Sequence, residues 1–314
     1  MQLTKKQLFL IGGFSLIIIF FISACKANFS PSTIHSKPVV KGSSISVTTQ
    51  EFLTAPTRLA GPNSDGFPCV RIPAIIKAPN GDLLAFWDGR PSGCPDAPAQ
   101  TSIVMRRSRN GGIDWENATI PAPRAIPSRI VKDVDGNFTK YDGYTDPNIV
   151  VDYEAGKIFL FAVLTHGAGL HGGLSPANPL DMKAAYFVSE NNGYTWKGPV
   201  DITQAFVDAE PNSYGRWASA GQGIQLTKQP HKGRLIVPFV DVVSTGNGRT
   251  FKAVNIYSDD HGRTWEAGQA VRGDMDENKV VELSDGSVLL NSRRSDRIKN
   301  RWVALSKDGG HSYT

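Results

Sequence analysis

Apolar residues in this chain occur in short runs rich in β-branched and aromatic side chains, separated by glycine, proline, asparagine and aspartate. Such runs predict strands, because these side chains pack well on a pleated surface. After the first 25 residues, no stretch of twelve residues keeps a helical period free of glycine or proline. The expected fold class is therefore all-β. The predicted strands cover 71–77, 83–87, 102–107, 148–152, 158–164, 184–189, 234–240, 253–258, 280–283, 287–291 and 302–306.

One eight-residue pattern, Ser-x-Asp/Asn-x-Gly-x-Thr-Trp, recurs directly after four of these strands. The copies are SRNGGIDW at 108–115, SENNGYTW at 189–196, SDDHGRTW at 258–265 and SKDGGHSY at 306–313. Serine and aspartate side chains accept hydrogen bonds from nearby backbone N–H groups, and glycine adopts positive φ, so each copy predicts a turn. The uneven spacing fits four-stranded propeller blades with insertions better than a compact solenoid.

Composition narrows the class of protein. The 314 residues are 40% hydrophobic and 20% charged, which is typical of a globular protein rather than a disordered one. The net charge of +5 is spread without a long basic run, so nucleic-acid binding is not indicated. This length fits one large all-β domain or two ordinary ones, and the repeats favour one domain over residues 50–314.

The N-terminus predicts export. Lys5 and Lys6 precede an apolar run over 8–22, which ends in Ser23 and Ala24 directly before Cys25. This junction resembles the bacterial lipobox, whose cysteine becomes lipidated. We expect a signal peptide at 1–24, lipidated Cys25 with a flexible tether at 25–49, and anchoring at the bacterial cell envelope by this lipid. An uncleaved signal anchor is the alternative.

Arg71 opens an apolar strand, which is unusual because a desolvated guanidinium needs an anionic partner. An ion pair between Arg71 and a surface carboxylate at the edge of the strand would also explain an arginine at this position. The Val-Arg-Ile-Pro-Ala segment at 70–74, followed by Asp-Gly-Arg at 88–90, resembles the signature of exo-sialidases, and the four repeats resemble their Asp-boxes. From about residue 50 onward the chain resembles bacterial exo-α-sialidases (neuraminidases), which are Asp-box (BNR-repeat) six-bladed β-propellers.

The resemblance implies retaining hydrolysis of terminal α-linked sialic acids from glycoproteins, glycolipids and oligosaccharides. Sialic acid carries a carboxylate on its anomeric carbon, which arginines bind through paired N–H donors. By resemblance, Arg71 and Arg293 bind this carboxylate, with Arg294 as the alternate to Arg293. Arg90 borders the hydroxyl side of the sugar, and Asp146 lines the pocket unless it belongs to an Asp-Pro turn.

The same resemblance assigns the proton transfers. A carboxylate nucleophile would repel the substrate, and the family uses a tyrosine activated by a glutamate, together with an aspartate as acid and base. Asp96 matches the aspartate, and Asp88 beside Gly89 is interpreted as a turn residue. Glu277 matches the glutamate, with Glu282 as second choice. This chemistry needs neither a cofactor nor a metal.

Two members of the family's machinery, the third arginine and the tyrosine, follow the fourth Asp-box, which in this chain ends at position 313. The strands account for about four of six blades. We therefore expect a truncated propeller that hydrolyses no sialoside as the 314-residue chain. A trans-sialidase shares the whole site, and a non-catalytic sialoside-binding propeller would keep the arginines, so both remain alternatives.

The other two cysteines stand beside the predicted site. Cys69 lies two residues before Arg71 and Cys94 two residues before Asp96. Because a lipidated Cys25 leaves an even number of thiols, we expect a disulfide between them, with two buried thiols as the alternative.

Three further motifs predict no site. Residues 167–172 match G-x-G-x-x-G, but prolines follow where a phosphate-binding helix would begin. His166 and His171 lack a third metal ligand, and the DVDGN segment at 133–137 lacks the later glutamate of a calcium loop.

Overall fold

The computed structural model describes residues 58–314 except for Pro98, 123–130, 133–137, 140–141, 167–168, 171–173, 178–181, Asn247, Arg272, Arg297 and Lys299. The predicted signal peptide, Cys25 and tether lie outside the described residues. The same holds for 133–137, most of 167–172, His171 and the side chain of His166. In the described part, no helix is long and apolar enough to cross a membrane.

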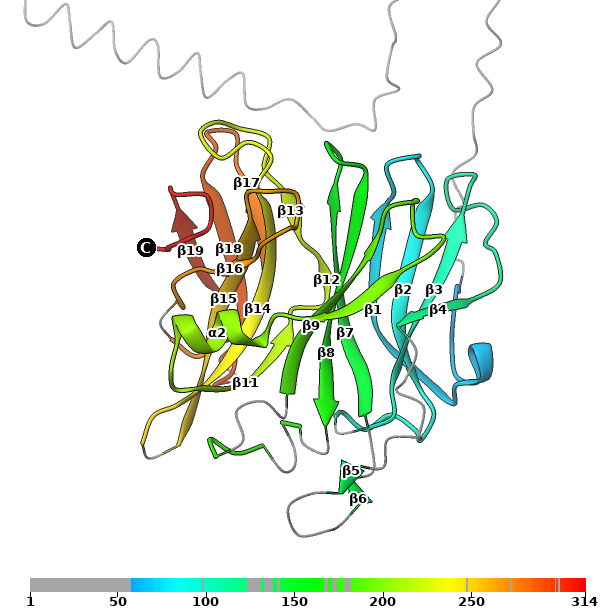
Figure 1. The fold of residues 1–314 in the computed structure, drawn as a ribbon, viewed down its shortest axis with the longest axis horizontal. Helices are drawn as coiled ribbons and strands as arrows, with labels where there is room; N and C mark the ends of the chain where they lie inside the picture. Colours follow the sequence, from blue (N-terminus) through cyan, green and yellow to red (C-terminus); the bar gives the residue numbers. More distant parts are fainter. Residues whose placement is uncertain are drawn as a thin grey trace, which may run out of the picture. The chain divides into compact units, whose positions relative to one another are not determined.

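The strands form four antiparallel sheets that follow one another along the chain (Figure 1). The first contains β1 (Cys69–Lys77), β2 (Leu83–Arg90), β3 (Ser102–Ser108) and β4 (Thr119–Ala122). The second contains β7 (Asp142–Asp152), β8 (Lys157–His166), β9 (Met182–Ser189) and β10 (Lys197–Asp201), and β12 (Gly221–Gln222) pairs parallel to β7.

The third sheet contains β11 (Ser213–Ala218), β14 (Leu235–Ser244), β15 (Arg249–Ser258) and β16 (Glu266–Ala267), with β13 (Ile224–Gln225) on β14. The fourth contains β17 (Met275–Glu282), β18 (Val288–Arg294) and β19 (Trp302–Ser306). Outside these sheets lie η1 (Ser64–Gly66), the pair β5 (Val131–Lys132) and β6 (Phe138–Thr139), and the short helix α2 (Thr203–Ala209).

Apolar side chains fill the spaces between consecutive sheets. Leu84 and Phe86 of the first sheet pack with Ile149 and Leu160 of the second. Phe159 and Phe161 of the second pack with Val237 and Phe239 of the third, and Ile236 and Tyr257 of the third with Val280 and Leu290 of the fourth. Because consecutive sheets pack face to face and share apolar cores, the four sheets are blades of a β-propeller, which confirms the all-β expectation.

The four repeats form the same turn after the third strand of each blade. The serine Oγ accepts a hydrogen bond from the glycine N–H at 2.8 Å in the turns of Ser108, Ser189 and Ser306, and at 2.9 Å in that of Ser258. In each turn the Asp or Asn Oδ1 accepts from the backbone N–H four residues later at 2.9 Å. The turn predicted from the repeat is therefore confirmed.

Every predicted strand overlaps a strand of the structure, but several others were missed. The most consequential is β11, whose sequence SYGRWA places serine, glycine and arginine among its apolar residues although all six are buried. Its buried Arg216 donates to the Met182 carbonyl and to Ser213 Oγ at 3.0 Å each. Met182 belongs to β9 of another blade, so the burial of Arg216 could not be inferred from the sequence of β11 alone.

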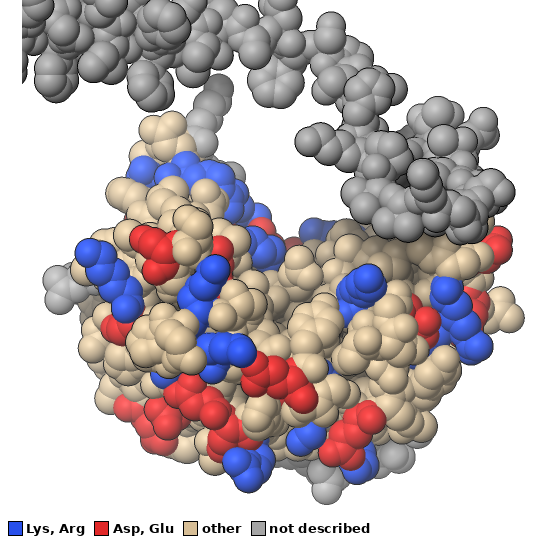
Figure 2. Space-filling view, turned by 90° about the horizontal axis from the view of Figure 1, so that it is seen from above, with Lys and Arg blue, Asp and Glu red and all other residues tan. Residues whose placement is uncertain are grey.

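Figure 2 shows the four blades from above, from the end of the strands where the turn between β7 and β8 lies. Lysine and arginine side chains alternate there with aspartate and glutamate, and neither sign covers the face. The pocket described next lies at the other end of the strands, where β1, β7 and β17 begin.

Candidate active site

A pocket of about 170 Å³ lies where the first strands of the blades begin. It contains all six predicted site residues: Arg71, Arg90, Asp96, Asp146, Glu277 and Arg293. They come from β1, β2, the loop after β2, β7, β17 and β18. The remaining lining residues are Ile72, Ala97, Thr145, Leu170, Met182, Trp217 and Asp276.

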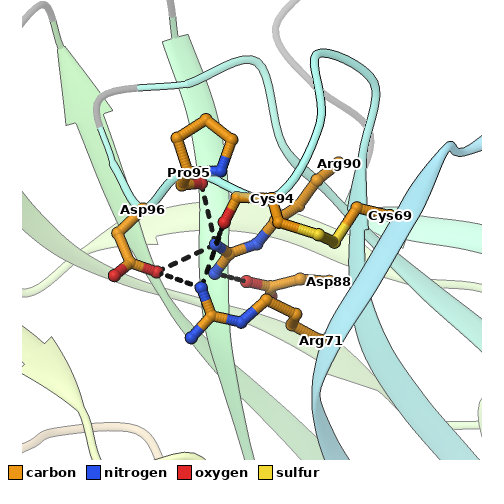
Figure 3. The surroundings of a disulfide bond; sticks show 7 residues. All are labelled: Cys69, Arg71, Asp88, Arg90, Cys94, Pro95 and Asp96. Atoms are coloured by element: carbon orange, nitrogen blue, oxygen red, sulfur yellow. Dashed lines mark hydrogen bonds and ion pairs between the residues drawn. A yellow bond between two sulfur atoms is a disulfide. The ribbon is translucent and has the colours of Figure 1, made fainter.

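The carboxylate of Asp96 accepts hydrogen bonds from two arginine side chains (Figure 3). Its Oδ1 lies 2.7 Å from Arg71 Nη1 and 2.9 Å from Arg90 Nη1. The Arg71 side chain is 41% exposed, whereas that of Arg90 is only 4% exposed. Arg71 is thus accessible to an anionic ligand, which would replace Asp96 as its partner. Arg90 also donates to the carbonyls of Cys94 and Pro95, at 3.2 and 2.8 Å, and so holds the loop that carries Asp96.

The interpretation of Asp88 as a turn residue is wrong. Asp88 lies within β2 and is fully buried. Its Oδ2 accepts from Arg90 Nη2 at 2.9 Å and its Oδ1 from the Asp146 N–H at 3.2 Å. Burial, and next the nearby charge of Asp146, raise the pKa of Asp88 well above its ordinary value. The neighbouring Gly89 suggested a turn, but the Cβ of a residue at 89 would clash with the ring of Phe67.

Cys69 and Cys94 form a disulfide, with their Cα atoms 5.4 Å apart (Figure 3). Cys69 begins β1 and pairs with Arg90 across the β1–β2 ladder. The disulfide therefore connects the strand that carries Arg71 to the loop that carries Asp96.

Backbone irregularities direct Arg71 and Asp146 into the pocket. Asp146 and Ile72, which follows Arg71, both have φ of 57°, unusual for residues other than glycine. Each lies where the strand register shifts, between Thr145 and Asn148 in β7 and between Arg71 and Ala74 in β1. Asp146 is thus part of an irregular strand rather than of a preceding turn.

The Asp146 carboxylate accepts from Thr145 Oγ1 at 2.7 Å. Burial raises the pKa of Asp146 to about 6, while the Thr145 hydrogen bond opposes the shift. Glu277 and Asp96 raise it further through their charges. Asp146 therefore titrates between pH 5 and 7.

Arg293 lies between two carboxylates at the start of β17. Its Nη1 is 3.0 Å from Glu277 Oε2, and its Nη2 is 2.5 Å from Asp276 Oδ2. The Arg293 and Glu277 side chains are 55% and 43% exposed, so both are accessible from the pocket. Asp276 is buried and supports Arg293 from behind. Asp276 was not predicted as a site residue, although its position beside Glu277 at the start of a strand was a usable signal.

The second-choice residues lie elsewhere. Glu282 ends β17 and accepts from the Thr227 N–H at 2.9 Å. Arg294 pairs with Asp296 and lies outside the lining of this pocket. Trp217, Met182 and Leu170 were also missed, since nothing local in their sequence marks them as pocket residues. Within the described ranges, no group of three His, Cys, Asp or Glu residues is placed to hold a metal ion.

The fold and the pocket define an Asp-box β-propeller with an accessible arginine and carboxylate site. Residues 81–314 match the BNR repeat-like domain family. The chain is 43% identical over 295 residues to a sialidase of Micromonospora viridifaciens, covering 93% of this chain and 42% of that protein. A sialidase of Bacteroides fragilis is 29% identical, with 80% and 44% coverage. The chain therefore belongs to the sialidase family of BNR-repeat proteins.

Solved structures of sialidases and of a trans-sialidase have the same fold as this chain. The Hadza microbial sialidase Hz136 superposes with a TM-score of 0.64 at 27% identity, covering 79% of this chain and 46% of that one. A leech intramolecular trans-sialidase, complexed with 2,7-anhydro-Neu5Ac, gives a TM-score of 0.68 at 17% identity and so shows the fold alone, with 83% and 53% coverage. The chain spans less than half the length of the two curated relatives named above.

Proposed function

We propose that the protein is an exo-α-sialidase that removes terminal α-linked sialic acids from glycoproteins, glycolipids and oligosaccharides with retention of configuration. The observation that carries this proposal is the pocket itself. It combines two exposed arginines, Arg71 and Arg293, with the carboxylates of Asp96 and Glu277. Relatives named sialidases support the same function.

Carboxylate binding is the first step. Arg71 and Arg293 present permanently charged donors from β1 and β18 into the same pocket, so both are available to an anionic group bound there. In the structure their donors are occupied by Asp96 and Glu277. A substrate carboxylate that binds Arg71 displaces Asp96, and this carboxyl group is then available to the glycosidic oxygen.

Proton transfer is the second step. Asp96 donates a proton to the leaving oxygen and later accepts one from water, as the retaining mechanism requires. Glu277 serves as the base that polarises a tyrosine nucleophile. The described residues lining the pocket include no tyrosine, so the roles assigned here concern binding and proton transfer.

Binding of 2,3-didehydro sialic acid, measured by calorimetry, tests the site. We expect Arg71→Ala and Arg293→Ala each to weaken binding at least tenfold, because each removes a charged donor. Arg263→Ala, an exposed arginine of an Asp-box turn, is the matched control and leaves affinity unchanged. The methyl ester of the ligand binds weakly to the wild type. Equal affinity for acid and ester would refute the proposal.

Turnover of a fluorogenic sialoside tests the enzymatic step. It is measured on this chain and on any longer product of the same gene, with the products identified by mass spectrometry. Wherever turnover occurs, we expect Asp96→Asn to lower kcat at least a hundredfold without weakening inhibitor binding to the same extent. Release of 2,7-anhydro sialic acid in place of free sialic acid would instead identify an intramolecular trans-sialidase.

We also propose that the protein is exported and anchored by lipid on Cys25. The leader sequence supports this, and so does the Cys69–Cys94 disulfide, because disulfides persist mainly in oxidising compartments. Metabolic labelling with a clickable fatty acid tests the anchor. The wild-type protein incorporates label and fractionates with membranes, and Cys25→Ser does neither. Label that persists in Cys25→Ser would disprove this anchor.

A further inference from the structure

A second cleft adjoins the candidate active site. Its volume is about 570 Å³, and Leu170, Asp276 and Arg293 line both it and the first pocket. The two spaces therefore adjoin at these three residues. The remaining lining residues are Arg249, Phe251, Arg294, Ser295, Ile298, Asn300 and Arg301.

The charge of this cleft is positive. Of the residues that the structure describes, four arginines line it, against one carboxylate, Asp276, which already pairs with Arg293. Arg294 is likewise neutralised by Asp296. Arg249 donates to the Leu170 carbonyl at 3.4 Å and Arg301 to the Asn291 carbonyl at 3.4 Å, both of which are uncharged acceptors. Among the described residues, no carboxylate lies within ion-pair distance of Arg249 or Arg301.

The two uncompensated arginines are held in place. Arg301 also donates through Nε to Asn291 Oδ1, and the Arg249 guanidinium lies 5.7 Å from the ring of Phe251. Leu170, Phe251 and Ile298 supply apolar surface beside them. Positioned guanidiniums next to apolar surface suit the anionic group of a sugar, whose ring packs on the apolar side chains.

We propose that this cleft is a second subsite, which binds an anionic group on the sugar next to the terminal sialic acid. The inference rests on the proposed function, because it places the terminal sialic acid in the first pocket. Because the two spaces share Leu170, Asp276 and Arg293, the cleft is the space nearest to Arg293 into which a ligand larger than one sialic acid can extend. The anionic group is either the carboxylate of a second sialic acid or a sulfate ester, both of which Arg249 and Arg301 bind as anions.

Calorimetry with three ligands tests the subsite. The ligands are α2,3-sialyllactose, whose adjacent sugar is neutral, α2,8-linked disialyllactose, and 6-sulfo-sialyllactose. We expect the preferred acidic ligand to bind about tenfold more tightly than sialyllactose at low salt, and the difference to shrink at high salt. Comparison of the two acidic ligands shows whether carboxylate or sulfate is preferred.

Substitutions of the two arginines test whether they cause the preference for the acidic ligands. Arg249→Gln and Arg301→Gln should each reduce the preference about threefold to fivefold while leaving the affinity for sialyllactose unchanged. Arg263→Gln, at an exposed turn, should change neither. Equal binding of all three ligands, or an equal loss for all three in the variants, would overturn the subsite and leave the proposed function standing. If none of the three ligands bound, the proposed function would fall together with it.

Discussion

Asp88, Arg90 and Asp146 show how single residues shape the pocket. A buried guanidinium is stable only with anionic partners, and Arg90 has two, Asp88 and Asp96. Asp88 also accepts from the backbone of Asp146, so one buried carboxylate positions both the loop of Asp96 and the irregular strand of Asp146. The pocket consequently depends on a residue that does not line it.

Asp146 makes anion binding depend on pH. Its pKa is raised to about 6, so the carboxyl group is mostly neutral at pH 5 and mostly ionised at pH 7. Ionisation adds negative charge to a site that binds an anion, and we expect the affinity for 2,3-didehydro sialic acid to fall about fivefold over this range. Asp146→Asn should flatten the profile in the same calorimetric titrations. A profile that rises with pH, or an unchanged slope in Asp146→Asn, contradicts this assignment.

At the scale of elements, the Asp-box turns combine a local conformation with a specific contact. Gly112 and Gly262 occupy the same position of the motif, with φ of 94° and 77°. A Cβ at Gly112 would lie 3.5 Å from Leu83 Cδ1, an ordinary contact, whereas one at Gly262 would lie 2.1 Å from the ring of Phe159. Phe159 is buried, packed against Tyr186 and Trp265, and has no room to shift.

The two glycines therefore form a matched pair. Gly112→Ala adds only the strain of the left-handed conformation, about 1 kcal/mol. Gly262→Ala adds a clash within the core and should cost about 3 kcal/mol of unfolding free energy in total. Urea denaturation of both variants measures the difference. Equal losses would show that the second blade moves to accommodate the methyl group.

At the scale of the molecule, four blades bring together residues that are far apart in sequence. The pocket joins Arg71 of the first blade to Arg293 of the fourth, and each blade packs only on its neighbours. The disulfide adds a covalent link across 25 residues in the first blade. It restricts the unfolded chain, and it also restrains the loop of Asp96 against β1.

Removing the disulfide should lower stability and loosen the loop. For a closure of this length we expect Cys69→Ser/Cys94→Ser to lose about 3 kcal/mol, measured by urea denaturation. Binding of 2,3-didehydro sialic acid by the folded variant should weaken, because Asp96 and Arg71 lose their fixed separation. Reduction of the wild type serves as the control and should reproduce both effects. Unchanged stability in the double variant would show that the link is not formed in solution.

Local features could be predicted from the sequence because their causes are local. The Asp-box turns depend on hydrogen bonds within eight residues and the strands on short apolar runs. Arg71, Asp96, Glu277 and Arg293 were chosen because the segments around them resemble those of exo-sialidases. Only the tertiary structure decided that Asp88 is buried beside Arg90, that β11 with its arginine is a buried strand, and that Asp276 supports Arg293. The cleft along Arg249 and Arg301 likewise exists only once β15 packs beside β17 and the loop between β18 and β19 lies near them. In each of these cases the environment of the residue depends on contacts made when the chain folds. Burial and pairing follow from the packing of strands and blades, which the adjacent residues in the sequence do not specify.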